Sequence, residues 1–180
     1  AVAHAVEAAV TRGRNAVSLL HAYSAFRLTH TSLPRVLDAP DDLSARGAMQ
    51  LGAAWAGIAI ENSMLGAAHS AANPLTAHHD IVHGQAVGMM LTYVVRYNAQ
   101  DDAARRAYVD LANHGGLTAH EDNDQVEALL RTLGALQEAA DLPASLAACG
   151  VPRSAIKALA EEGRTMIVVT HEMAFARDVS

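Results

Sequence analysis

The sequence predicts an all-α protein folded as an antiparallel helical bundle, and three observations point to this class. Alanine, the strongest helix former, occupies 39 of the 180 positions. Aromatic residues, which favour strands, make up only 4% of the chain. Leucine recurs at helical spacing between short turns, a pattern typical of helices that pack against their neighbours in sequence.

Seven helical segments are predicted, each with apolar residues at helical spacing and a turn after it. They are residues 1–10, 16–29, 45–72, 83–97, 103–113 and 124–140, and a short helix between 143 and 152.

Capping and breaking residues set the ends of these segments. Pro34 ends the second helix and Pro74 the third, because proline lacks the N–H that an inner helical turn requires. Asp42 or Ser44 can cap the start of the third helix. That helix is apolar on all sides, which predicts that it is buried.

Residues 164–170 are a compact β-branched run and read as a buried parallel strand. No second strand of such a sheet is evident in the sequence. An orphan strand-helix tail is therefore expected after the bundle.

Composition excludes several classes of function. A net charge of −6 leaves no basic footprint for nucleic acid or an anionic membrane. A mean hydropathy of +0.11 excludes a disordered chain. The single cysteine, Cys149, excludes an internal disulfide framework, and with no secretory signal it suits the cytoplasm.

Four of the ten histidines lie within fifteen residues: His69, His78, His79 and His83. His69 is near the end of the third predicted helix and His83 at the start of the fourth, so a break between them lets two imidazoles converge on a metal ion. Histidines at such positions are, however, more often hydrogen-bonded helix caps. Spacing alone leaves both interpretations open.

The order and spacing of the motifs resemble the iron-containing (group III) alcohol dehydrogenases over residues 1–155. The segment Gly66-Ala-Ala-His69 matches that family's Gly-x-x-His motif, and a His83-Gly84 step follows fourteen residues later. The opening Ala3-His4-Ala-Val-Glu7 matches the end of an Asp-x-x-x-His-Ala-x-Glu motif, with the aspartate expected just before Ala1.

The resemblance implies a metal site and a reaction. His4, His69 and His83 would bind Fe²⁺ or Zn²⁺, which acts as a Lewis acid. Hydride would pass between a small alcohol or aldehyde and NAD(P), as in an iron-dependent alcohol dehydrogenase. A homo-oligomer is possible.

Two departures from the family pattern affect the expected activity. Many members carry a proton-transferring histidine where this chain has Asn73, and an amide is no general base. His78 and His79 are weak candidates for that role, although a solvated loop pair is the commoner interpretation. No glycine-rich phosphate loop occurs, so no cofactor-binding residues are assigned and the chain alone is expected to be inactive.

The tail, residues 156–180, resembles the switch-histidine segment of ATP-binding cassette ATPases, with His171 at the switch position. The chain lacks the Gly-x-x-x-x-Gly-Lys loop that ATP hydrolysis needs. Two units are therefore predicted, a helical metal-binding domain over 1–155 and a foreign tail over 156–180. The alternative function is a non-catalytic helical interaction module without metal dependence.

Overall fold

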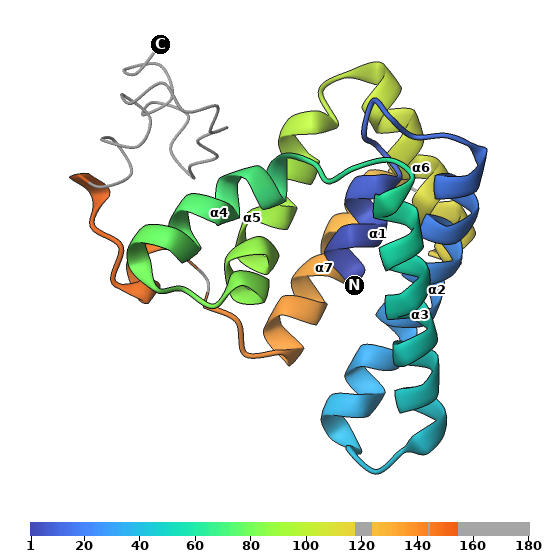
Figure 1. Ribbon diagram of the computed structural model, residues 1–180, viewed down its shortest axis with the longest axis horizontal. Coiled ribbons are helices and arrows are strands. Elements are labelled where there is room, and N and C mark those ends of the chain that lie inside the picture. Colours follow the sequence, from blue (N-terminus) through green and yellow to red (C-terminus); the bar gives the residue numbers. More distant parts are fainter. Residues whose placement is uncertain (118–123, 144, 155–180) are drawn as a thin grey trace.

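The computed structural model describes residues 1–117, 124–143 and 145–154, and every regular element among them is helical (Figure 1). The elements are α1 (Val2–Ala8), α2 (Ala16–Asp38), α3 (Leu43–Glu61), α4 (Ala67–His79), α5 (His83–Asn98), α6 (Asp102–Gly115), α7 (Gln125–Ala139) and the 3₁₀ helix η1 (Ala147–Cys149). The predicted all-α class is confirmed. The predicted strand at 164–170 and the tail at 156–180 lie outside the described residues.

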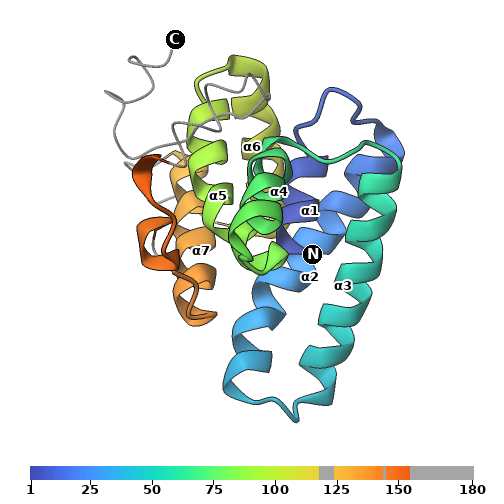
Figure 2. The same cartoon turned by 60° about the vertical axis from the view of Figure 1, so that its left-hand side comes forward.

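Helix α1 forms the centre of the bundle, where it contacts α2, α3, α4 and α5 (Figures 1 and 2). Ala5, Val6, Ala8 and Ala9 are fully buried. Small side chains let the surrounding helices approach this short central helix closely, which explains the high alanine content. Helices α2 and α3 form a long antiparallel hairpin along one side of the molecule.

The α2–α3 hairpin depends on a close approach at Gly52. A Cβ atom at this position would lie 2.7 Å from Thr29 Cγ2, 3.1 Å from Leu28 Cβ and 3.4 Å from the carbonyl oxygen of Ala25. These neighbours belong to α2, and β-branched Thr29 has few rotamers with which to move away. Glycine is therefore required at this crossing.

Replacing Gly52 with alanine is expected to lower the free energy of unfolding by about 1–3 kcal/mol, because the added methyl group overpacks the crossing. Gly57→Ala in the same helix is the matched control, since a Cβ there meets nothing within 4 Å. That control should raise stability by up to ~1 kcal/mol through helix propensity. Urea unfolding of both variants measures the difference, and equal stabilities would contradict the close approach.

Pro34 does not end α2, contrary to the sequence prediction, because the helix continues through it to Asp38. The missing N–H costs one hydrogen bond inside the helix. Packing of the last turns of α2 along α3, together with an ion pair between Arg35 and Asp42 at 2.6 Å, outweighs this cost.

The predicted helix over 45–72 is in fact two helices, α3 and α4, separated by a turn at 62–66. Met64 adopts a left-handed conformation there with φ 74°. Ser63 Oγ donates to the carbonyl of Ala59 at 2.8 Å, while the Ser63 carbonyl accepts from Thr11 Oγ1 at 2.9 Å. The chain thus turns where it is tied to the loop after α1. Pro74, expected to close this helix, lies inside α4.

The α3 helix is also less buried than its all-apolar sequence predicts. Leu43 is 81% exposed, and Leu51 and Ile58 are more than 40% exposed, because α3 packs on one side only. None of the described helices has both the length and the apolar character needed to cross a membrane.

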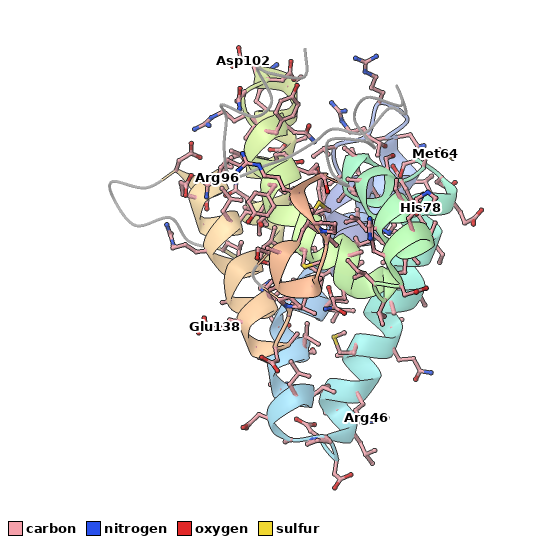
Figure 3. All side chains as sticks on the ribbon, turned by 90° about the vertical axis from the view of Figure 1, so that its left-hand side faces the viewer. Arg46, Met64, His78, Arg96, Asp102 and Glu138 are labelled. Atoms are coloured by element: carbon pink, nitrogen blue, oxygen red, sulfur yellow. The ribbon has the colours of Figure 1, made fainter. Side chains whose placement is uncertain are left out.

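The remaining predicted helices, over 1–10, 83–97, 103–113 and 124–140, are confirmed with ends shifted by at most two residues, and the short helix expected between 143 and 152 is the 3₁₀ helix η1. Asp42 caps α3 by accepting from the backbone N–H of Ala45 at 3.0 Å. The labelled charged side chains Arg46, Arg96 and Glu138 lie on separate parts of the surface (Figure 3).

Candidate metal centre

The fold brings together the three histidines predicted as metal ligands. His4 comes from α1, His69 from the first turn of α4, and His83 is the first residue of α5. The ring centroids of His4 and His69 are 4.9 Å apart, and those of His69 and His83 are 5.4 Å apart. The His69 ring is therefore next to each of the other two imidazoles, although 65 residues separate it from His4 in sequence.

Two backbone breaks create this convergence. The turn at 62–66 directs the first residues of α4 towards α1, and this turn was not predicted. Between α4 and α5, Asp80 adopts a left-handed conformation with φ 53° and reverses the chain, so that α5 starts beside α4. Ile81 anchors that reversal in the core, where it is 6% exposed.

The three imidazoles differ in their burial. His69 is only 4% exposed, His4 is half-buried and His83 is exposed. Burial is the main cause that lowers the pKa of His4 to about 4. The imidazole of His4 is therefore neutral at pH 7, which is the form that binds a metal.

Glu7 lies one helical turn after His4 and joins α1 to α4. Its Oε1 accepts from the backbone N–H of Ala68 at 2.6 Å and of His69 at 3.3 Å, and its Oε2 contacts Nδ1 of His69. The carboxylate is 2% exposed. It therefore occupies the N-terminus of α4, where backbone N–H groups and the helix dipole favour a negative charge.

A cleft of about 440 Å³ opens beside the histidines. All three imidazoles line it, and the rest of its wall is mostly aliphatic: Val2, Leu33, Met49, Val87, Leu91, Leu133, Leu136 and Leu142 are among the lining residues. Such a wall suits the carbon chain of a small apolar molecule, while the imidazoles supply the polar end of the cleft.

The three imidazoles suit a transition metal in their chemistry and in the distances between neighbouring rings. Imidazole is a usual ligand for iron and zinc. Since a ligating nitrogen lies about 2 Å from zinc, two imidazoles on one tetrahedral ion have ring centroids roughly 5 Å apart. Within the described ranges, however, no three His, Cys, Asp or Glu side chains are placed so that they could already hold an ion. The three imidazoles lie near one another, but they are not arranged as the ligands of one ion.

The weaker sequence candidates do not line this cleft. Asn73 is exposed on α4, His78 is exposed near the end of that helix (Figure 3), and His79 is half-buried beside it. Sequence reasoning missed Glu7 as the partner of His69. A signal for it exists in the spacing, because residues 4 and 7 share one face of a helix.

Comparison with known proteins decides the family. The model of the Fe-containing alcohol dehydrogenase family, C-terminal part, matches residues 1–176. The chain belongs to the iron-containing alcohol dehydrogenases. This match extends past residue 155 into the segment whose sequence resembles an ATPase, and the ATPase resemblance of the tail stays a prediction.

Curated relatives of this alcohol dehydrogenase chain agree with the family. The bifunctional aldehyde-alcohol dehydrogenase AdhE of Escherichia coli K12 is 34% identical over 84% of this chain, which spans 19% of that protein. The 1-propanol dehydrogenase PduQ of Salmonella typhimurium is 31% identical over 84% of this chain and 41% of its own length. The chain thus spans less than half the length of these relatives.

Solved structures agree with the helical fold of this dehydrogenase chain. A 1,3-propanediol oxidoreductase superposes with a TM-score of 0.82 at 29% identity, over 89% of this chain and 42% of that chain. An alcohol dehydrogenase from Oenococcus oeni superposes with a TM-score of 0.80 at 25% identity, over the same two fractions. The helical bundle is therefore the fold of this part of the family.

Proposed function

We propose that this chain is the metal-binding part of an NAD(P)-dependent dehydrogenase that interconverts a small alcohol with an aldehyde or ketone. His4, His69 and His83 bind the metal, Fe²⁺ or Zn²⁺. The convergence of these three imidazoles at one end of an apolar cleft carries the proposal. Family membership and the alcohol dehydrogenase activity named for the relatives support it.

Each ligand is held differently by its helix. His4 is fixed by the buried helix α1, His69 by the carboxylate of Glu7, and His83 only by its place at the first turn of α5. When bound, such an ion supplies a Lewis acid for the oxygen of the alcohol or carbonyl group, and NAD(P) supplies the hydride donor or acceptor.

The cleft residues bind and orient the substrate. Aliphatic side chains from α2, α3, α5 and α7 hold its carbon chain and exclude water from the histidine end. The chain offers no glycine-rich phosphate loop in its sequence. Turnover is therefore a property we assign to the longer enzyme of which this chain is the metal-binding part, and not to these 180 residues alone.

Zinc titration of the wild-type chain and of the variant His83→Ala tests the proposal. His83 is exposed, so the variant should fold as well as the wild type, while its affinity for Zn²⁺ should fall by at least tenfold on loss of one ligand. Isothermal titration calorimetry gives the affinity, and thermal unfolding with and without Zn²⁺ gives an independent readout, since a ligand of the folded state raises Tm.

His114→Ala is the matched control. His114 is also an exposed helical histidine, but its ring stacks on Tyr23 and it does not line the cleft. This variant should bind Zn²⁺ as the wild type does. Equal binding by the wild type and His83→Ala would contradict the assignment of His83 as a ligand, and no Zn²⁺ binding by the wild type would favour a helical interaction module without metal dependence.

A further inference from the structure

We propose that Glu7 is a positioning residue that holds the His69 ring with Nδ1 turned away from the cleft, so that Nε2 is the atom offered to the metal. This inference rests on the proposed function and adds a residue and an orientation to it. Its basis is the set of contacts that one buried carboxylate makes with one histidine.

Both oxygens of Glu7 are engaged by the same short segment. Oε1 accepts from the N–H groups of Ala68 and His69, at 2.6 Å and 3.3 Å, and Oε2 contacts the ring nitrogen Nδ1 of His69. The carboxylate therefore fixes the backbone and the ring of His69 together. An ordinary helix cap would bind the backbone alone.

The surroundings are shaped for this carboxylate. A Cβ atom at Gly66 would lie 2.9 Å from Glu7 Oε1 and 3.2 Å from Glu7 Cδ, so α4 can begin here only because residue 66 has no side chain. The Glu7 and His69 side chains are 3% and 5% exposed. Because both side chains are buried, losing this contact leaves a buried polar group without its partner, which is costly.

In this arrangement Glu7 contacts His69 and is not itself a metal ligand. The cleft that the three imidazoles line does not include Glu7 among its lining residues. Glu7 lines instead a separate cavity of about 310 Å³, together with Asn98 and Tyr108. The carboxylate thus borders a different cavity from the cleft that the imidazoles line.

The contact decides the tautomer of His69. A carboxylate only accepts hydrogen bonds, so the Nδ1 that it contacts must carry a proton. In a neutral ring the lone pair is then on Nε2, and this nitrogen is the one available to a metal. A carboxylate behind a histidine in this way also raises the basicity of the ligand and fixes its orientation.

Glu7→Gln separates this role from helix capping. Glutamine has the same shape, and its carbonyl oxygen can still accept from Ala68 and His69. Its NH₂ group would then face Nδ1 and favour the opposite tautomer, with the proton on Nε2. If the amide turns round instead, the two backbone N–H groups face a donor and the helix start is lost.

The experiment compares Zn²⁺ binding by the wild-type chain, Glu7→Gln and Asp101→Ala. Asp101 also caps a helix with its carboxylate, accepting from Ala103 and Ala104 at the start of α6, and it is remote from the cleft. We expect Glu7→Gln to bind Zn²⁺ about 10–100-fold more weakly than the wild type. Asp101→Ala should bind it as tightly as the wild type, even though its Tm falls.

The ¹⁵N NMR spectrum of the histidine-labelled chain provides a readout that does not depend on affinity. With Zn²⁺, the wild-type His69 ring should show a protonated Nδ1 and a metal-bound Nε2. Coordination through Nδ1, or unchanged Zn²⁺ affinity in Glu7→Gln, would overturn the inference and leave the proposed function standing. A wild-type chain that binds no Zn²⁺ would overturn both, and this outcome is distinct from the other two.

Discussion

Replacing His69 with alanine is expected to abolish Zn²⁺ binding and also to destabilise the metal-free chain. His69 is 4% exposed and its ring contacts the buried carboxylate of Glu7. Removing His69 leaves the buried carboxylate of Glu7 without one of its hydrogen-bond partners, which costs about 1–3 kcal/mol or more. Calorimetric Zn²⁺ titration and urea unfolding without metal measure the two effects on one protein sample.

His83→Ala is the control for this double effect. It removes a ligand of the same type, but from an exposed position with no carboxylate behind it. Both variants should therefore lose Zn²⁺ affinity, whereas only His69→Ala should unfold at markedly lower urea concentration. If both variants keep the stability of the wild type, the Glu7–His69 contact does not contribute to folding.

Replacing Phe26 with alanine is expected to lower the free energy of unfolding by about 3–5 kcal/mol. Phe26 is fully buried on α2 and stacks on His30, with ring centroids 4.7 Å apart. The ring also meets α6 at Gly115, where a Cβ atom would lie 2.7 Å from it. Truncation leaves a cavity between two helices that cannot close over it, in a domain whose total stability is about 5–15 kcal/mol.

Leu20→Ala is the matched control for Phe26→Ala, because it truncates a large apolar residue of the same helix that is 65% exposed. Its effect should stay within about 0.5 kcal/mol. Urea unfolding followed by circular dichroism compares the two variants. A similar loss of stability in both would show that the α2–α6 contact is not part of the core.

Most helix ends could be predicted from apolar spacing and from caps such as Asp42, because these signals act within a few residues, although one helix was expected where the fold has α3 and α4. Pro34 and Pro74 misled the prediction. A proline inside a helix costs one hydrogen bond locally, and contacts with neighbouring helices offset this cost. A prediction from the residues next to the proline does not include those contacts.

The break between α3 and α4 was missed for a related reason. This turn contains only residues that break a helix weakly, namely Asn62, Ser63 and Gly66. The apolar residues on both sides continue the helical pattern across it. The turn forms because Thr11 and Asn15, some fifty residues earlier, bind the carbonyls of Ser63 and Asn62. The histidines of the site were recognised by a family motif. The same motif includes Glu7, but only the fold shows that Glu7 contacts His69.

The turn at 62–66 has a consequence for which insertions and deletions the chain tolerates. An α-helix rotates by about 100° per residue, so adding or removing one residue in this turn would change the face that α4 presents to α1. His69 would leave the cleft, and Glu7 would meet a different part of α4. An exposed turn is usually the segment of a protein that varies most freely in length. Here its length is set by the histidine that follows it.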